Sequence, residues 1–409
     1  MAPMRPTAAD LRVPKNKGKA TMPRIVKVEV HEFEYTAENV ALGNGGFDLV
    51  QAPGRSMVLS KFAVVIEAEG GLRGEYAGLW GATKMSLAQT LMLAPHLIGR
   101  NPFHREHIYD EFKRALRQYD HMGHGFLDIA LWDLTGKAAG LSVSVLLGGW
   151  RERLPAYAST THGDRNGGLS SPQDYVDFAE HCYGLGYRAF KVHGWYEGDV
   201  EEEVETIRRL GETVGGRMAL MLDPACHLRT FSDTVRVGRA CDQAGFRWLE
   251  DPFRDAGTSA FAHRKLKQLI RTPILQTEHV RGLEPKADFI IAVGTDLLRS
   301  DPEYDMGLTG AIKIGHLAES LGVDVEIHAS GPAHRHLMAA TRNTSFYEVA
   351  LVGPCARNPL PQCYADDYSD DLEAVGKDGC FPVPKGPGLG VRYDWDWINE
   401  RRTAFHEFA

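Results

Sequence analysis

Three acidic residues stand at the ends of short apolar runs, and nearly equal lengths of chain separate them. Asp223 ends MALMLD, Glu250 lies in FRWLED and Glu278 ends PILQTE, at intervals of 27 and 28 residues. Each acid alone could be a helix cap or a surface charge, but an even rhythm is typical of strand-helix units whose strand ends meet at one rim of a barrel. Three carboxylates gathered there repel one another unless a cation neutralises them, and oxygen ligands suit Mg²⁺. The pattern predicts one Mg²⁺ per active site and a metal-dependent enzyme.

The overall composition is ordinary for a globular protein and has no basic surplus. The 409 residues are 43% hydrophobic and 24% charged, with a formal net charge of -8. Nucleic acid is not an expected partner, because phosphate backbones are bound through clustered Lys and Arg. No apolar stretch approaches the roughly 20 residues that span a bilayer, so no membrane partner is expected either. The six cysteines include no C-x-x-C pair and are too sparse for a disulfide framework, which predicts a cytoplasmic protein.

The first part of the chain has an antiparallel character. Residues 1–23 have no apolar signal core, so we expect a flexible N-terminal extension, with an organellar address as the alternative. From residue 24, alternating segments include a strand pair that turns at Gly70 and Gly71, and helical segments continue to about residue 150. The polar, glycine-rich stretch from Thr36 to Met57 has no clear period. It predicts a long loop that helps to set specificity.

From residue 151 to 384, short apolar strands alternate with amphipathic segments, which predicts parallel strands joined by crossover helices. Eight such units favour a closed barrel over an open doubly wound sheet, and no G-x-G-x-x-G follows the first strand. The tail, 385–409, is rich in Pro and Gly and then aromatic, and we expect it to pack on the first part. The last strand is expected at 348–352, and the other strand ends are expected near Thr161, His193, Asp223, Glu250, Glu278, Asp301 and His328.

Two further pairs of residues lie at these strand ends. Lys191 and His193 are two apart on one predicted strand, so both side chains point to the same face. His328 ends VDVEIH and Asp301 ends DLLRSD one unit earlier, which predicts a carboxylate that orients an imidazole. Each of these residues alone is also explained by an ordinary ion pair or a structural histidine. Spacing does not rank five other histidines near strand ends or loops: His162, His227, His279, His334 and His336.

Together, these residues and the motifs around them resemble the mandelate racemase subgroup of the enolase superfamily. The likeness runs from Arg24 to the tail and includes DIALWDLTGK, LLGG, WLEDP and DMGLTGAIKIGHLAESLG. It implies an α/β fold in which an α+β capping domain, 24–150 completed by 385–409, covers a modified (β/α)7β TIM barrel, 151–384. It also implies that the three acids bind Mg²⁺ and that His328 and Asp301 form a dyad. A glutamate of the eighth strand, matched by Glu348, would hydrogen-bond the substrate carboxylate.

Two departures from the subgroup affect the expected chemistry. Many members have Lys-x-Lys where this chain has Lys191-Val192-His193, so a histidine occupies the usual base position. The segment after Asp223 reads DPACH in place of D-x-N, which leaves Ala225 without a side-chain amide. A simple racemase with a lysine base on one face is therefore not expected.

The resemblance and the two histidines favour an acid sugar dehydratase. A hydroxy acid would meet Mg²⁺ through its carboxylate and 2-hydroxyl, and Lys191 and Glu348 would contact the carboxylate. Either His193 or His328 would remove the α-proton, and an imidazole would protonate the departing β-hydroxyl to give a 2-keto-3-deoxy acid. The alternatives are a racemase or epimerase of a 2-hydroxy acid, and a non-catalytic protein that binds acid sugars.

Three residues are candidates for contacts with the rest of the substrate: Arg55, Tyr76 and Trp80. A polyhydroxylated anion needs guanidinium or hydroxyl donors and an aromatic lid that excludes water. Arg55 is also explained as a solvated loop charge and Trp80 as a packing residue. The expected partner is a small hydroxy acid or acid sugar, and we expect the chain to form a homo-oligomer.

Overall fold

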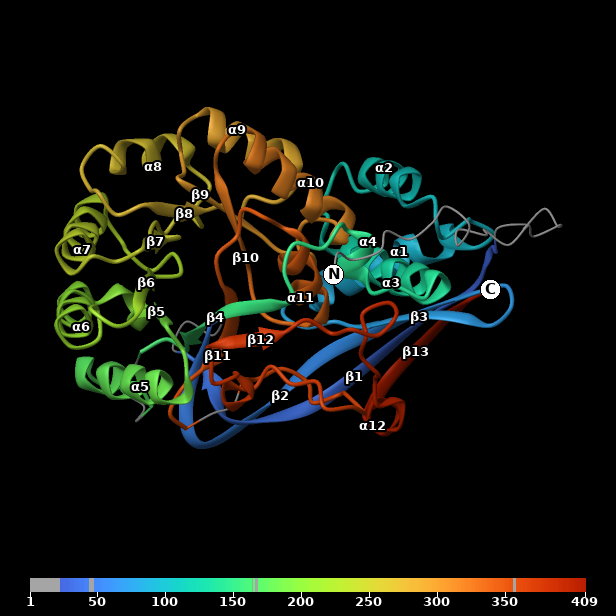
Figure 1. Ribbon diagram of the computed structural model, residues 1–409, viewed down its shortest axis with the longest axis horizontal. Helices are drawn as coiled ribbons and strands as arrows, with labels where there is room; N and C mark the ends of the chain where they lie inside the picture. Colours follow the sequence, from blue (N-terminus) through green and yellow to red (C-terminus); the bar gives the residue numbers. More distant parts are fainter. Residues whose placement is uncertain (1–22, 44–47, 164, 166–167, 356–357) are drawn as a thin grey trace, which may run out of the picture.

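An antiparallel sheet and a curled, mainly parallel sheet divide the chain in this computed structural model. The structure describes residues 23–409 apart from 44–47, 164, 166–167 and 356–357, so the predicted N-terminal extension lies almost wholly outside the described residues. Figure 1 shows the parallel strands and their helices at the left, and the antiparallel sheet with its own helices at the right and below. This arrangement is the predicted modified barrel with a separate capping domain.

The antiparallel sheet joins the two ends of the chain. Its order is β13-β1-β2-β3, with β1 at Ile25–Leu42, β2 at Leu49–Ala68, β3 at Leu72–Ala77 and β13 at Arg402–Phe408. The turn between β2 and β3 has left-handed backbone at Gly70 and Gly71 (φ 86° and 79°), which glycine adopts without a Cβ clash. The predicted strand pair is therefore confirmed. The tail returns to this sheet because β13 pairs antiparallel with β1.

The predicted loop between Thr36 and Met57 is wrong, because β1 and β2 continue through it as one long hairpin. Pairing runs from Thr36 opposite Val58 to Leu42 opposite Leu49. The register shifts beyond Glu38, where β2 carries extra residues, and this break hides the strand period in the sequence. Figure 1 shows the hairpin extending from the small sheet to the lower edge of the barrel.

Five helices accompany the antiparallel sheet: α1 (Lys84–Leu93), α2 (Arg105–Ala115), α3 (Met122–Ala139), α4 (Val143–Leu146) and α12 (Trp395–Glu400). Helix α3 carries the DIALWDLTGK motif and is buried from Gly123 to Gly136. Asp128 accepts hydrogen bonds from the backbone N and the side-chain oxygen of Thr309 (2.9 and 2.7 Å), and Trp132 donates to the same oxygen (2.9 Å). The motif thus joins the cap to a barrel helix.

The parallel strands follow one another around the barrel in the order β10-β9-β8-β7-β6-β5-β4-β11. Their bounds are β4 (Arg153–Thr160), β5 (Ala189–His193), β6 (Ala219–Asp223), β7 (Trp248–Glu250), β8 (Ile274–Gln276), β9 (Leu297–Ser300), β10 (Asp324–Ile327) and β11 (Tyr347–Val352). A short strand, β12 (Cys380–Pro382), pairs antiparallel with β4. The predicted strand ends agree with these bounds to within two residues.

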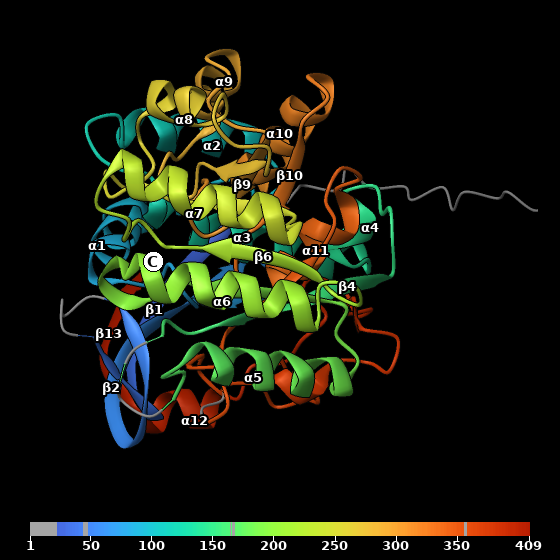
Figure 2. The same ribbon diagram turned by 90° about the vertical axis from the view of Figure 1, so that its left-hand side faces the viewer.

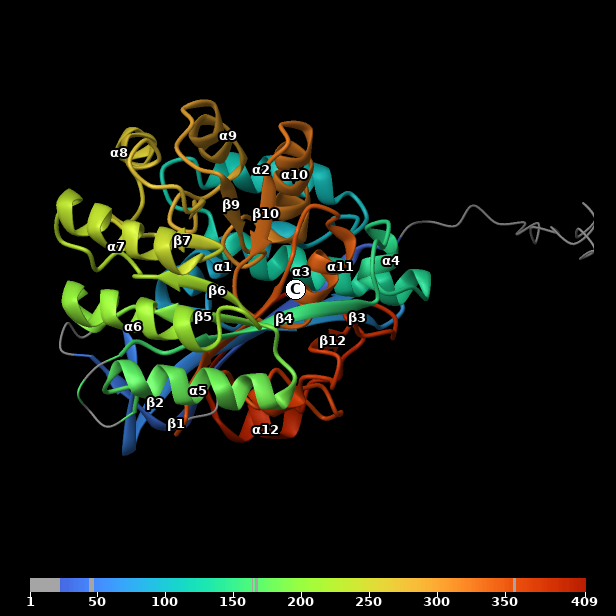
Figure 3. The ribbon, with the colours of Figure 1, turned by 60° about the vertical axis from the view of Figure 1, so that its left-hand side comes forward.

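Helices cover the outside of the barrel: α5 (Pro172–Leu185), α6 (Val200–Thr213), α7 (Phe231–Ala244), α8 (Ala260–Leu266), α9 (Leu283–Ile291), α10 (Gly307–Ser320) and α11 (Pro332–Ala340). Figure 2 shows α5, α6 and α7 as parallel rows in front of the strands, and Figure 3 shows the series continuing through α10. Side-chain oxygens of Ser171, Thr230 and Ser259 cap the starts of α5, α7 and α8.

The interior of the barrel has two layers of side chains: an apolar layer inside the strands and a charged layer at the carboxyl ends of the strands. Tyr157, Met221, Trp248 and Leu275 form one buried cluster inside the strands. Charged residues follow at the carboxyl ends of the same strands, where barrels place their functional groups. The apolar layer closes the barrel beneath the charged layer, so access to the charged layer is from the side of the cap.

All six cysteines lie within the described residues and are free thiols. Within those same ranges, no helix has both the length and the hydropathy needed to cross a bilayer.

Packing of α3 on the sheet gives a stability prediction. A Cβ added at Gly74 of β3 would lie 2.1 Å from the carbonyl oxygen of Ala130 and 2.5 Å from Cβ of Leu134. Gly74→Ala should therefore lower the free energy of unfolding by about 1–3 kcal/mol in a urea titration. Gly184→Ala, at an exposed position of helix α5 with open space around it, should raise the free energy of unfolding by roughly 0.5–1 kcal/mol. Equal stability of the two variants would contradict the packing.

Candidate active site

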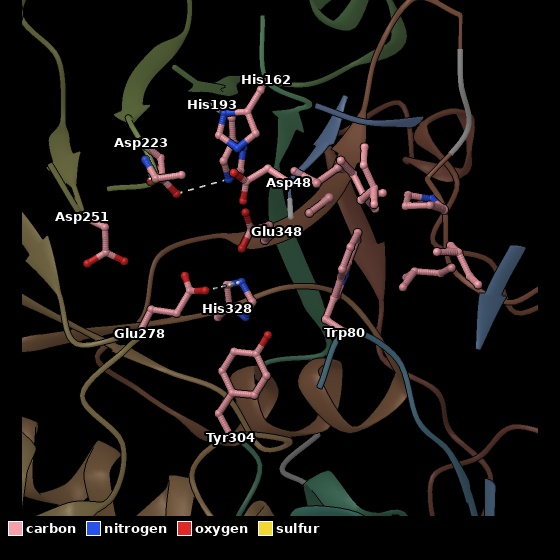
Figure 4. A pocket seen from close by; sticks show the side chains of 18 of the residues that line it. Asp48, Trp80, His162, His193, Asp223, Asp251, Glu278, Tyr304, His328 and Glu348 are labelled. Carbon is pink, nitrogen blue, oxygen red and sulfur yellow. Dashed lines mark hydrogen bonds and ion pairs between the residues drawn. The ribbon is translucent and has the colours of Figure 1, made fainter. Parts of the chain in front are cut away.

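A cavity of about 460 Å³ lies at the carboxyl ends of the barrel strands, where the β1–β2 hairpin and the turn after β3 face them. Figure 4 shows its ionisable side chains converging from several strands. The barrel contributes His162, His193, Asp223, Ala225, Asp251, Glu278, His279, Tyr304, His328, Glu348, Ala350, Leu351, Pro359 and Leu360, and the cap contributes Leu42, Asp48, Leu49, Met57, Leu59, Lys61 and Trp80.

Most of the predicted site residues meet at this cavity. His193, Asp223, Glu278, His328, Glu348 and Trp80 line it. Lys191 and Asp301 lie directly behind lining residues and contact them, whereas Glu250 reaches the lining only through its ion pair with Lys191. Arg55 is exposed on β2 and is not among the lining residues, because it belongs to the extra segment of the irregular hairpin.

Tyr76 has a different role from the one that its position in the sequence predicts. It is fully buried outside the cavity lining, and its hydroxyl donates to Oε1 of Glu303 (2.8 Å). The same carboxylate accepts hydrogen bonds from the backbone N–H groups of Leu79 (2.7 Å) and Gly81 (2.6 Å). Tyr76 and Glu303 therefore fix the turn that carries Trp80, and Tyr76 does not reach a substrate in the cavity.

Two buried cations hold the carboxylates behind the cavity. Lys191 Nζ lies 3.1 Å from Oδ2 of Asp223, 3.0 Å from Oε2 of Glu250 and 2.9 Å from Oε1 of Glu348. Arg299 Nε lies 2.7 Å from the other oxygen of Glu250, and its Nη2 lies 3.1 Å from the other oxygen of Glu348. Burial lowers the pKa of Lys191, but Glu250 and Glu348 outweigh it and raise the pKa well above its usual value.

The acids at the cavity surface form a set of oxygen donors that fits a hard divalent cation. Asp223, Asp251 and Glu278 line the cavity, whereas Glu250 does not and has both oxygens in ion pairs. Ligand atoms of Asp251, Glu278 and His279 lie within 4.8 Å of one another, and Oδ1 of Asp251 is buried without a hydrogen-bond partner among the described residues. Burial, together with Glu278 and Asp223, raises the pKa of Asp251 well above its usual value. A cation would relieve this repulsion.

The predicted His328–Asp301 contact is present. Nδ1 of His328 donates to Oδ2 of Asp301 (2.6 Å), while Nε2 of His334 reaches the other carboxylate oxygen (3.3 Å). The imidazole of His328 stacks on Tyr304 with ring centroids 5.3 Å apart, and its Nε2 lies 3.5 Å from Oε1 of Glu278. Burial lowers the pKa of His328, but Glu278 and Asp301 outweigh it and raise the pKa to about 9.

A second imidazole faces the cavity from the opposite side of Glu348 (Figure 4). His193 has Nε2 3.3 Å from Oδ2 of Asp223, and its Nδ1 is hydrogen-bonded to Oγ of Ser159 (3.3 Å). The ring of His162 lies 5.3 Å from it. Each of the two histidines expected to move protons therefore has its own carboxylate partner.

The strand ends around the cavity have strained backbone. Ala225, Asp251, Thr277 and Ala329 all have positive φ (45°, 36°, 91° and 62°), which is uncommon for residues with a Cβ. The backbone N–H of Ala225 donates to Oδ1 of Asp223 (2.8 Å), so a main-chain amide contacts this acid where the side-chain amide is missing. Strain of this kind gathers at functional sites, where the surrounding structure maintains it.

Sequence reasoning missed several residues of the site, among them Asp48, Asp251, Arg299 and Tyr304. Asp251 and Tyr304 follow predicted strand ends closely, so their positions were a usable signal. Asp48 lies on the hairpin that was predicted to be a loop, and its Oδ2 is 3.2 Å from Nε2 of His227. Nothing in the sequence marks Arg299 as a buried cation.

Models of two protein families match the chain. The enolase C-terminal domain-like family matches residues 174–397, and the N-terminal domain family of mandelate racemase and muconate lactonizing enzyme matches 54–148. The chain therefore belongs to the enolase superfamily, in its mandelate racemase and muconate lactonizing enzyme branch.

Individual relatives differ in the reactions that their names describe. The chain is 29% identical to D-galactarolactone cycloisomerase of Agrobacterium fabrum over 83% of its own length and 90% of the relative's. It is 28% identical to L-rhamnonate dehydratase of Saccharopolyspora erythraea, with 86% and 87% covered. The crystal structure of D-glucarate dehydratase from Agrobacterium tumefaciens, complexed with magnesium, superposes with a TM-score of 0.83 at 28% identity, covering 94% of this chain and all of that one.

The buried ion network predicts a large loss of stability when Arg299 is removed. Arg299→Met leaves Glu250 and Glu348 with only Lys191 between them, and breaking a buried pair in this way costs about 3–5 kcal/mol of unfolding free energy. Urea unfolding followed by circular dichroism measures the effect. Arg342→Met, which removes an exposed pair with Glu319, is the matched control and should leave the midpoint nearly unchanged. A similar small change for both variants would contradict the role of Arg299.

Proposed function

We propose that the protein is a Mg²⁺-dependent acid sugar dehydratase that converts a hydroxy acid to a 2-keto-3-deoxy acid. The observation that carries this proposal is the pair of histidines on either side of Glu348, each with its own carboxylate partner. Loss of water requires a base for the α-proton and an acid for the departing hydroxyl. The dehydratases among the relatives support the same reaction class.

Asp223, Glu250 and Glu278 are the proposed ligands of Mg²⁺. Asp223 and Glu278 offer oxygens at the cavity surface, and each oxygen of Glu250 keeps a lone pair beyond its contact with a cation. Bound there, Mg²⁺ would stabilise the negative charge that develops on the substrate carboxylate when the α-proton leaves. Asp251 lies beside these ligands and is the alternative third carboxylate.

The other residues bind the substrate and move protons. Lys191, already within 2.9 Å of Glu348, supplies a fixed positive charge for the substrate carboxylate. Glu348 accepts a hydrogen bond from the backbone N–H of Ala329 (2.7 Å), so its carboxylate is held in place before a substrate binds. His193 or His328 takes the α-proton, and a protonated imidazole gives a proton to the β-hydroxyl oxygen, which leaves as water.

A racemase or epimerase is the second candidate, because one base on each side of the α-carbon would also allow a proton to leave from one side and return to the other. Such an enzyme would exchange the α-proton with solvent and keep the carbon skeleton intact. A dehydratase would release a keto acid. The two candidates are therefore separated by their products.

His328→Asn tests the dehydratase directly. The amide cannot accept the α-proton or donate to the hydroxyl as an imidazolium, so kcat should fall roughly 10²–10⁴-fold with a mixture of acid sugars and Mg²⁺. Keto acid trapped with semicarbazide measures turnover, and α-deuterium incorporation from D₂O reports racemisation. His316→Asn, on helix α10 away from the cavity lining, is the control. Unchanged turnover in His328→Asn would contradict the assignment.

Metal binding has a readout that needs no turnover. Mg²⁺ should raise the midpoint of thermal unfolding through preferential binding to the folded state, and EDTA should reverse this. Asp223→Asn and Glu278→Gln should abolish the rise. Comparing Glu250→Gln with Asp251→Asn identifies the third ligand: if only Asp251→Asn removes the response, the assignment of Glu250 is wrong.

A further inference from the structure

One cation of the cap faces the cavity without an acidic partner. Lys61 alternates with Met57 and Leu59 along β2, so all three side chains lie on the same face of the strand, and all three line the cavity. Within the described residues, no carboxylate lies at ion-pair distance from Lys61. Burial lowers its pKa to about 8, and the charge of Glu303 only partly offsets this.

The surroundings of Lys61 make this charge unusual. The cap otherwise lines the cavity with Leu42, Leu49, Met57, Leu59, Trp80 and Asp48. Asp48 is already engaged by His227, with Oδ2 and Nε2 3.2 Å apart. Among the described residues of the cap, Lys61 is thus the one basic residue in an otherwise mostly apolar wall. A half-buried charge in an apolar wall is poorly solvated without a counter-ion, so an occupant of the cavity with a negative charge is expected here.

The same wall offers a second unused donor. Trp80 lines the cavity from the turn after β3, and its indole Nε1 is buried with no hydrogen-bond partner among the described residues. An indole N–H only donates, so it also calls for an acceptor. An anionic oxygen at this wall, beside Trp80, would give Lys61 the counter-ion that it lacks.

We propose that Lys61 binds a second carboxylate at the far end of the substrate, so that the preferred substrates are diacid sugars with a carboxylate at each end. This inference rests on the proposed function, which assigns the first carboxylate to Lys191 and Glu348 on the barrel side. A cavity of about 460 Å³ has room for a six-carbon diacid. A carboxylate suits this wall better than a phosphate, because a phosphate dianion is usually bound by several charged or backbone donors.

Matched substrates test the inference. Six-carbon diacid sugars should be dehydrated with a higher kcat/KM than the corresponding monoacids, in which a terminal CH₂OH replaces the second carboxylate. Lys61→Met keeps the aliphatic length of the side chain and removes its charge. It should lower kcat/KM for the diacid about 10- to 100-fold and change the monoacid value less than about 3-fold.

Controls separate loss of charge from loss of fold. Lys61→Arg should retain the preference for diacids, and Lys84→Met, which removes an exposed lysine outside the cavity, should leave both substrates unaffected. Circular dichroism and the thermal midpoint show whether each variant is folded. If Lys61→Met is poorly folded, Lys61→Gln takes its place in the same comparison.

Direct binding distinguishes failure of this inference from failure of the proposed function. Calorimetry with Mg²⁺ measures the affinity for a diacid and its matched monoacid without requiring turnover. If no substrate yields keto acid but Lys61→Met weakens diacid binding alone, the inference stands and the dehydratase assignment fails. The inference is overturned if diacids and monoacids are dehydrated equally well, or if Lys61→Met lowers kcat/KM for both by the same factor. Either result would mean that Lys61 does not bind a second carboxylate.

Discussion

The central constraint on this structure is the need to hold several carboxylates together inside a barrel with little water. Lys191 and Arg299 satisfy this requirement, because each of them contacts both Glu250 and Glu348. In each glutamate, one carboxylate oxygen contacts Lys191 and the other contacts Arg299. An isolated buried carboxylate would cost several kcal/mol, whereas here two positive charges balance the two negative charges of Glu250 and Glu348, and Lys191 also contacts Asp223. Because the two cations and these two glutamates lie on four different strands, they also fix the carboxyl ends of the strands relative to one another. The site is therefore organised by the barrel before any ligand binds.

The cap depends on this organisation, since it is attached at the same rim. Glu303 follows β9 and binds the turn that carries Trp80, while the β1–β2 hairpin reaches His162, two residues after β4, through a bridge with Val50. The barrel strands were predictable because most of the apolar runs end at or just before an ionisable residue. The hairpin was not, because its irregular register and polar composition hide the two-residue period that marks a strand. The cap residues that line the cavity were therefore harder to predict from the sequence than the charged residues at the ends of the barrel strands.

The same difference applies to individual residues of the site. The even spacing of three acids located them correctly at neighbouring strand ends, but it could not show that Glu250 lies behind the cavity and Asp251 at its surface. If β7 continued with strict alternation, the side chain of Asp251 would point away from the barrel interior. Its positive φ of 36° breaks the alternation, and the side chain lines the cavity. Arg299 and Lys61 were missed for another reason: most cations are exposed, and only three-dimensional contacts show that Arg299 is buried and that Lys61 is half-buried at the cavity. Such contacts join segments far apart in the sequence.

The two histidines differ in a way that bears on their chemistry. Asp301 accepts from Nδ1 of His328, which fixes the orientation of the ring and directs Nε2 toward Glu278 and the cavity. His193 has the opposite arrangement, because its Nε2 faces Asp223 and its Nδ1 faces the hydroxyl of Ser159. A serine hydroxyl can donate or accept, so it does not impose one tautomer as a carboxylate does. Proton transfer needs a nitrogen that is aimed at the substrate, and His328 is oriented by Asp301, which is not one of the proposed metal ligands. In His193, Nε2 contacts Asp223, an acid proposed to bind Mg²⁺, so under the proposed function its proton transfer would depend on that ligand.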